Sequence, residues 1–313
     1  MPRVCAVLGA SGFLGSHLVE ALIAMGDRVI GLDDFSSGRK ENLEEASSNR
    51  NFRFFTHDII NPIPLSERVD VVFNAASLAS PKFYLANPIQ TLLTGSEGSL
   101  NAIRLALKNS ARYVYFSTSE VYGDPLEHPQ REAYWGNVNP VGIRSCYDEA
   151  KRFGEALTMA YVREHSLNGG IVRIFNTYGP RLQPGDGRVV SNLIAQTLTQ
   201  RPMTVYGTGL QTRSFCYVSD LIRAIQKFSC VNESGPINIG NPNEVTIREL
   251  ALLISEIAGR TPLLEFLNLP QDDPVRRQPD ISLAARVIDW APEITLVKGL
   301  ELTIDWFQRN LPQ

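Results

Sequence analysis

Residues 4–15 have the sequence VCAVLGASGFLG, in which an apolar strand runs directly into Gly9, Gly12 and Gly15. The helical pattern SHLVEALIAM follows at once. At such a junction a glycine permits a tight turn with positive φ, the bare backbone lets a pyrophosphate approach, and the helix start offers unpaired N–H groups. Three glycines alone are weak evidence, but their place between a strand and a helix indicates a dinucleotide-binding turn.

Apolar runs and helical patterns alternate through the first half of the chain. Strands are expected within 3–10, 27–33, 52–59, 69–76, 112–119 and 169–177, and helices over about 15–25, 88–108 and 147–164. This alternation predicts an α/β fold with a Rossmann-type, doubly wound parallel sheet. Because the strands are apolar throughout, helices should cover both faces of the sheet.

The sequence pattern changes after residue 175, where short helices, isolated strands and proline-bearing loops are expected. We therefore assign residues 1–175 to a dinucleotide-binding Rossmann domain. Residues 176–313 are assigned to a smaller C-terminal substrate-binding lobe, from which a segment near 213–240 is expected to return to the main sheet.

Composition excludes several classes of protein. A formal net charge of −3 over 313 residues offers no basic surface for nucleic acid. No apolar run approaches the ~20 residues of a membrane span, and no cleavable signal pattern is present, so a cytoplasmic protein is expected. The four cysteines are far apart and form no CxxC pair, and the histidines are equally scattered. We therefore expect reduced thiols and no metal site.

The predicted second strand ends at Asp33, whose carboxylate can accept hydrogen bonds from an adenosine ribose and repel a 2′-phosphate. This position favours NAD over NADP, although Arg39 and Lys40 leave NADP open. Asp58, at another strand end, could meet the adenine amine or simply cap a loop. We also expect cofactor contacts from the residues beside these turns: Phe13, Leu14, Ile59, Ala75 and Ala76.

Tyr147 and Lys151 form a YxxxK pair on a predicted helix and so lie one turn apart on the same face. A nearby ammonium stabilises phenolate, which would make the tyrosine a usable base, and Lys151 could also hold the nicotinamide ribose. YxxxK often arises by chance in helices. A catalytic role for the pair is supported by STSEVYG, residues 117–123, which follows a strand. This segment places Thr118, Ser119 and Glu120 at the carboxyl edge of the sheet.

On these motifs the chain resembles the extended short-chain dehydrogenase/reductases, and within them the UDP-glucuronate decarboxylases. The resemblance covers nearly the whole length. It rests on the glycine turn, on YxxxK and on LDDFSSGRKENL, STSEVYGDPLEHPQ, YWGNVNP, CYDEAKR, RIFNTYGPR, DGRVVSN, VYGTGLQTRSF, INIGNP and DDPVRRQPDI.

The resemblance implies NAD-dependent decarboxylation of UDP-glucuronate through a 4-keto sugar to UDP-xylose, or to the UDP-4-keto-pentose. Tyr147, assisted by Thr118 and Ser119, would take the proton of the 4-hydroxyl. Arg277 would orient the carboxylate or the enolate, and Glu120 would manage protons at carbon 5. Ser119 stands where a 4,6-dehydratase would carry Asp, and a 4-epimerase would usually lack Glu120. The 4-epimerase and the 4,6-dehydratase are the alternative activities, and a non-catalytic NAD-binding protein is a more remote alternative.

The resemblance also implies a nucleotide site and an assembly. The UDP half of the substrate would contact Asn176, Arg188, Val190, Tyr206, Gln211 and Arg213. A homodimer is expected, paired through the helices near 88–108 and 147–164. The chain departs from the family pattern at Asn74, Leu78 and Gly95, and Gly95 would remove a hydrogen-bonding side chain near the cofactor.

Overall fold

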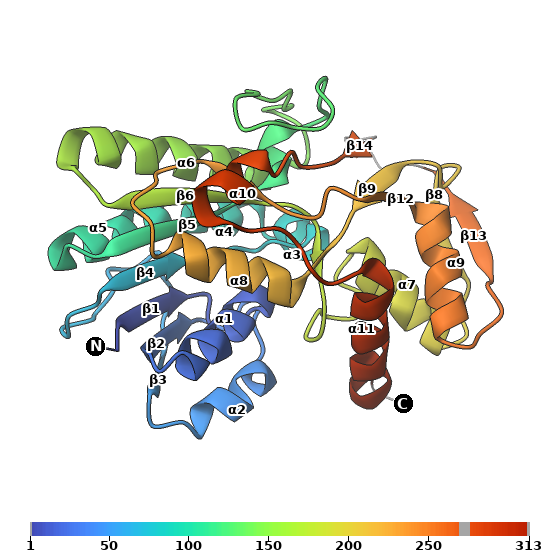
Figure 1. Ribbon diagram of the computed structural model, residues 1–313, viewed down its shortest axis with the longest axis horizontal. Helices are drawn as coiled ribbons and strands as arrows, with labels where there is room; N and C mark the ends of the chain where they lie inside the picture. Colours follow the sequence, from blue (N-terminus) through green and yellow to red (C-terminus); the bar gives the residue numbers. More distant parts are fainter. Residues whose placement is uncertain (1, 269–275, 312–313) are drawn as a thin grey trace.

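The computed structural model describes residues 2–268 and 276–311. A seven-stranded parallel sheet lies at its centre, in the order β11–β6–β5–β4–β1–β2–β3 (Figure 1). Its strands are β1 (Val4–Leu8), β2 (Arg28–Asp33), β3 (Phe52–Thr56), β4 (Val71–Asn74), β5 (Arg112–Thr118), β6 (Gly169–Ile174) and β11 (Ile237–Ile239). The strand order reverses between β1 and β4, so the predicted doubly wound parallel sheet is confirmed.

Both faces of this sheet are buried, because alternate side chains of each strand enter different cores. On β1, Cys5 and Val7 belong to one apolar cluster, and Ala6 and Leu8 belong to the other. The helices of the first face are α1 (Phe13–Ala24) and α8 (Val218–Phe228), and those of the second are α4 (Pro88–Leu93), η2 (Thr94–Gly98), α5 (Ser99–Asn109) and α6 (Ser145–His165). None of the helices that the structure describes has the length and apolar character needed to cross a membrane.

A smaller lobe lies beside the carboxyl ends of the strands, at the right of Figure 1. It contains α7 (Val189–Leu198), β8 (Met203–Tyr206), β9 (Thr212–Ser214), β12 (Glu244–Thr246), α9 (Ile247–Ile257), β13 (Leu264–Leu267), β14 (Arg276–Arg277) and α11 (Leu296–Asn310). The connecting elements are η1 (Lys40–Leu43), α2 (Glu44–Ser47), α3 (Pro81–Ala86), η3 (Ser119–Tyr122), β7 (Thr177–Tyr178), β10 (Cys216–Tyr217) and α10 (Ser282–Ile288).

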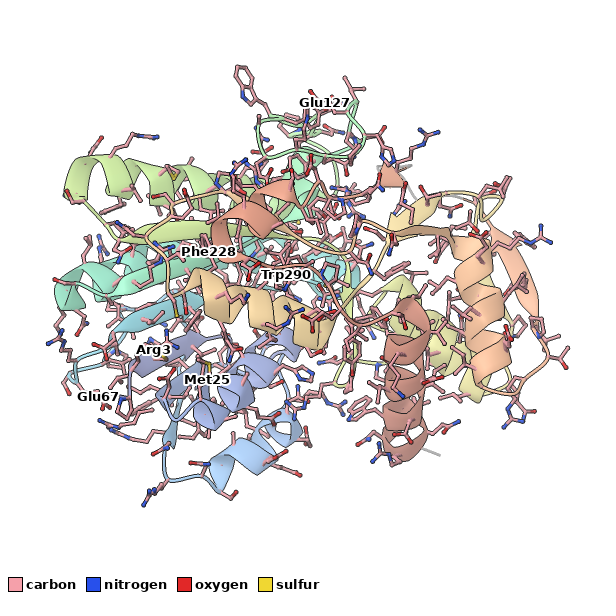
Figure 2. The ribbon with its side chains drawn as sticks, viewed as in Figure 1. Arg3, Met25, Glu67, Glu127, Phe228 and Trp290 are labelled. Carbon is pink, nitrogen blue, oxygen red and sulfur yellow. The ribbon has the colours of Figure 1, made fainter. Side chains whose placement is uncertain are left out.

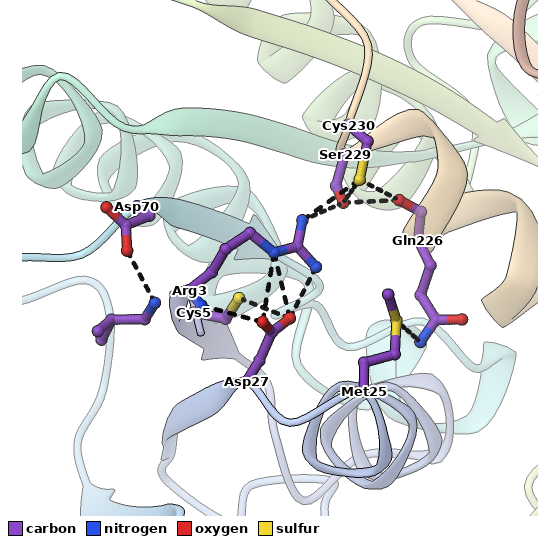
Figure 3. Close-up of polar contacts among 9 residues, drawn as sticks. Arg3, Cys5, Met25, Asp27, Asp70, Gln226, Ser229 and Cys230 are labelled. Atoms are coloured by element: carbon purple, nitrogen blue, oxygen red, sulfur yellow. Dashed lines mark hydrogen bonds and ion pairs between the residues drawn. The ribbon is translucent and has the colours of Figure 1, made fainter. Parts of the chain in front are cut away.

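The second half of the chain returns to the main sheet through α8 and β11. β11 pairs with β6, and α8 packs against α1. Figure 3 shows the guanidinium of Arg3, beside β1, bonded to the Asp27 carboxylate at 2.7 Å and to the Ser229 hydroxyl at 3.2 Å. The indole of Trp290, labelled in Figure 2, donates to the Asp220 carbonyl of α8 at 2.9 Å. These contacts fix α8 to the N-terminal strand and to the C-terminal segment.

The helix expected over 88–108 is interrupted by the wider turn of η2, which contains Gly95. A Cβ built on Gly95 would lie 2.6 Å from the Cβ of Ala150 on α6, so this glycine allows two helices to approach closely. Gly95 is not among the residues that line the cavity described below. Its role in the structure is helix packing, and its expected place near the cofactor stays a prediction.

Candidate active site

A cavity of about 570 Å³ is lined by residues from the carboxyl edge of the main sheet and from the smaller lobe. This is the position at which open α/β sheets bind their ligands. The expected site residues on its wall are Gly9, Gly12, Phe13, Leu14, Gly15, Ala75, Thr118, Glu120, Tyr147, Lys151, Asn176, Arg188, Val190, Tyr206, Gln211, Arg213 and Arg277. The cavity therefore brings together side chains from both halves of the chain.

The glycine turn is shaped to accept a diphosphate. Gly9 has a φ of +82°, and a Cβ built on Gly15 would lie 1.9 Å from the Gly9 carbonyl oxygen, so neither position accommodates a larger residue. Helix α1 begins directly after Gly12, and no side chain caps its first N–H groups. These unpaired donors and the positive end of the helix dipole fit the pyrophosphate of NAD.

Asp33 and Asp58 are not among the described residues that line the cavity. The Asp33 carboxylate accepts hydrogen bonds from the backbone N–H groups of Ser11 and Phe35, both at 2.9 Å, and burial raises its pKa. Asp58 accepts from the Ile60 N–H at 3.0 Å and from the Gln90 amide at 3.3 Å. Each carboxylate thus orders the loop in which it lies, and the contacts expected with ribose and adenine remain predictions.

Ile59, Ala76 and Ser119 also lie away from the cavity wall. Ile59 is buried in the second core, and the Ala76 backbone lies 2.8 Å from a Cβ built on Gly9. Ser119 is buried, and its carbonyl oxygen accepts a hydrogen bond from Arg277. Arg277 thus holds the backbone of Ser119, and the assistance of its hydroxyl to Tyr147 stays a prediction.

Tyr147 and Lys151 face the cavity from α6, as expected for residues one turn apart. The Lys151 ammonium donates to the Phe116 carbonyl at 2.8 Å and lies 5.8 Å from the centre of the Tyr147 ring. Burial raises the pKa of Tyr147 to about 12, against the effect of its hydrogen bond with Thr118, and burial lowers the pKa of Lys151 to about 7. Burial is the largest influence on the tyrosine, and stabilisation of its phenolate by Lys151 stays a prediction.

Glu120 and Arg277 form an ion pair on the cavity wall although 157 positions separate them in the sequence. Arg277 is buried, and its Nη2 lies 3.3 Å from Oε2 of Glu120 and 3.0 Å from the Gly123 carbonyl oxygen. Burial opposes ionisation of Glu120, but the charges of Arg277, Arg144 and Arg213 outweigh it and lower its pKa. Glu120 is therefore a carboxylate at neutral pH.

The expected nucleotide contacts lie on the lobe side of the cavity. Arg188 precedes α7 and is 3.6 Å from the Asp186 carboxylate, and Val190, two residues later, is buried. The Gln211 amide donates to the Tyr206 carbonyl at 2.8 Å. β14 pairs with β9 so that Arg277 lies opposite Arg213, which places two guanidinium-bearing residues side by side. In the part of the chain that the structure describes, no group of three His, Cys, Asp or Glu residues is arranged to hold a metal ion.

Two wall residues, Arg144 and Tyr84, were missed by sequence reasoning. Arg144 lies 2.9 Å from Oε2 of Glu120, and the Tyr84 ring stacks on that of Tyr147. The only signal for Arg144 is its place three residues before Tyr147, one turn along the helix start. Tyr84 carries no such signal, because its helix α3 meets α6 only in the folded protein.

Comparisons with known proteins agree with this geometry. The NAD dependent epimerase/dehydratase family model matches residues 5–240. UDP-glucuronic acid decarboxylase 1 of Arabidopsis thaliana is 50% identical over 305 residues, covering 97% of this chain and 70% of that protein. The protein of the same name from Xenopus tropicalis is 46% identical, covering 97% of this chain and 72% of its own.

Among solved structures, UDP-glucuronic acid 4-epimerase from Bacillus cereus in complex with UDP-glucuronic acid and NAD is similar, with a TM-score of 0.90 at 28% identity. The alignment covers 98% of this chain and 99% of that one. The resemblance to the extended short-chain dehydrogenase/reductases is therefore confirmed. Because the family match spans most of its length, the chain belongs to the NAD dependent epimerase/dehydratase family.

Proposed function

We propose that this chain uses NAD to convert UDP-glucuronate into UDP-xylose and carbon dioxide. Relatives that share about half of its residues over nearly its whole length are named UDP-glucuronic acid decarboxylases. The structural observation that carries the proposal is the pair Glu120 and Arg277, held 3.3 Å apart on the wall that also bears Tyr147. A carboxylate and a guanidinium at this place fit chemistry on a substrate acid.

The glycine turn would hold NAD, which would supply reversible hydride transfer at carbon 4 of the sugar. The residues of the chain supply binding and proton handling. Tyr147 takes the proton of the 4-hydroxyl and later returns it, and Thr118 holds the phenol oxygen in place. The ammonium of Lys151, when charged, favours the phenolate form of Tyr147, whose ring centre lies 5.8 Å away.

The carboxyl group lies toward Glu120 and Arg277 in this proposal. Arg277 orients the substrate carboxylate and stabilises the enolate left when carbon dioxide departs, because a guanidinium offers two parallel donors. Glu120, a carboxylate at rest, takes one proton from water and relays it to carbon 5. Arg188 and Arg213 bind the diphosphate, and Tyr206 offers a flat apolar surface to the uracil base.

The alternatives are epimerisation at carbon 4, dehydration, and NAD binding without catalysis. Retention of Tyr147, Lys151 and Glu120 on one wall argues against the silent protein. The test is incubation of the purified protein with UDP-glucuronate and catalytic NAD, followed by carbon dioxide release and proton NMR of the sugar. UDP-xylose is the expected product, and a UDP-4-keto-pentose would mean that the ketone escapes. UDP-galacturonate without carbon dioxide would refute the proposal in favour of the epimerase.

We further propose that the protein is a cytoplasmic homodimer of two-lobed subunits, with residues 1–175 and 176–313 as the lobes. The apolar residues Ile89 on α4 and Phe153 on α6 are 73% and 47% exposed, and these helices pack side by side. The cysteines of the described chain are free, which suits a reducing compartment. Light scattering should give a dimer for the natural chain and a monomer for Ile89→Glu with Phe153→Glu. A natural chain that is monomeric would refute the dimer.

A further inference from the structure

Arg144 occupies a place in the cavity that none of the functions assigned above requires. It directly precedes α6, its side chain is 17% exposed, and its Nη2 lies 2.9 Å from Oε2 of Glu120. Arg277 approaches the same oxygen at 3.3 Å. Two guanidinium groups therefore hold one carboxylate oxygen, so the direction of the Glu120 carboxylate depends on both.

A second contact joins Arg144 to the tyrosine. The rings of Tyr84 and Tyr147 are stacked, with centres 5.1 Å apart and planes at 8°. The guanidinium carbon of Arg144 lies 6.0 Å from the centre of the Tyr84 ring, within the range of a cation–π contact. Tyr84 is 1% exposed, so it has no room to move independently of its neighbours. The contacts thus run without a break from Tyr147 through Tyr84 and Arg144 to Glu120.

The charge of Arg144 matters in this buried setting. Burial first and the charge of Glu120 second raise the pKa of Asp148 to about 7, against the opposing charges of Arg144 and Arg277. Arg144 therefore acts on two carboxyl groups that would otherwise repel one another. With a neutral residue at this position, the Glu120 carboxylate would be held less firmly in its orientation and its pKa would be higher.

We propose that Arg144 is a positioning residue that couples the two reacting carbons, an inference that rests on the proposed function. By holding Glu120, Arg144 determines which face of carbon 5 receives a proton. By contacting Tyr84, it holds the ring of Tyr147, which exchanges the proton of the 4-hydroxyl. When the bond between carbon 5 and the carboxyl group breaks, its electron pair enters the enolate of the 4-ketone. Glu120, a carboxylate at rest, takes one proton from solvent and passes it to carbon 5, which forms the new bond and restores the carboxylate.

The experiment follows this proton in deuterium oxide. The natural chain should place one deuterium at a single position of carbon 5 of UDP-xylose, as read by proton NMR. Arg144→Gln should lower kcat about tenfold or more, the loss of one charged contact to a reacting group. It should also distribute deuterium over both positions and increase the share of UDP-4-keto-pentose. Arg144→Lys, which keeps the charge but loses the two-nitrogen fork, should show smaller changes of the same kind.

Two further variants separate positioning from general damage. Tyr84→Leu removes only the stacked ring, so it should slow turnover and release more ketone while deuterium stays at one position. Arg131→Gln removes a surface arginine that lies 3.6 Å from Glu127, and it should match the natural chain throughout.

Single-position labelling and unchanged kcat in Arg144→Gln would overturn the inference while leaving decarboxylation intact. If Arg144→Gln does not fold, the same comparison with Arg144→Lys decides. A natural chain that releases no carbon dioxide from UDP-glucuronate would overturn the proposed function and this inference with it.

Discussion

Replacing Lys151 by Met should make the protein more stable while abolishing its activity. The ammonium of Lys151 is buried, and burial lowers its pKa from 10.5 to about 7. Because a pKa change of one is worth about 1.4 kcal/mol, keeping this group charged in the folded protein costs about 5 kcal/mol at most. The hydrogen bond to the Phe116 carbonyl at 2.8 Å returns part of this cost. Allowing for that bond and for relaxation, we expect Lys151→Met to raise the free energy of unfolding by about 2 kcal/mol at pH 6.

The pH dependence gives the sign of the effect. Between pH 7 and 10.5 the unfolded chain binds a proton at Lys151 that the folded chain does not, so raising the pH stabilises the natural protein. Lys151→Met lacks this titration. The advantage of the variant should therefore be greatest below pH 7 and should shrink as the pH approaches 10.

Urea unfolding of both proteins freed of NAD, at pH 6, 8 and 9.5, measures this difference. Lys298→Met is the matched control, because Lys298 is 59% exposed and pairs with Glu301 on the outer face of α11. The control should change stability little at any pH. A Lys151→Met variant that is less stable than the natural chain at pH 6, or whose advantage is the same at all three pH values, would refute the reasoning.

Three other changes test the site and the packing around it. Asp33→Asn should weaken the preference for NAD over NADP about tenfold, because it removes a charge that repels a 2′-phosphate. Calorimetry with both cofactors measures the two affinities. The control Asp34→Asn, at the exposed neighbouring position, should leave the ratio of the two affinities unchanged. Tyr147→Phe should reduce carbon dioxide release about 10²–10⁴-fold while UDP-glucuronate still binds, and loss of binding in equal measure would contradict a role in proton transfer. Gly95→Asn should lower the free energy of unfolding by about 1–3 kcal/mol, because its Cβ would meet that of Ala150 at 2.6 Å. Combining it with Ala150→Gly should restore part of this loss, as measured by urea unfolding. Strictly additive effects of the two changes would rule out the contact.

The sheet, the glycine turn and the YxxxK pair could all be recognised in the chain because each depends on residues that are close in sequence. A strand that is apolar at every position must be buried on both faces, and the turn after β1 needs a residue that adopts a φ of +82°. Tyr147 and Lys151 share a face wherever their helix lies. The local pattern therefore placed the carboxyl edge of the sheet and the residues that reach it.

The contacts between distant segments were decided only by the tertiary structure. Arg277 meets Glu120 because β14 pairs with β9 in a register that brings the smaller lobe over the sheet. The same packing turns Arg277 toward the carbonyl of Ser119, and the contact of α3 with α6 stacks Tyr84 on Tyr147. Residue spacing carries no information on how two lobes dock, because docking depends on the shape and burial of surfaces formed after the elements themselves.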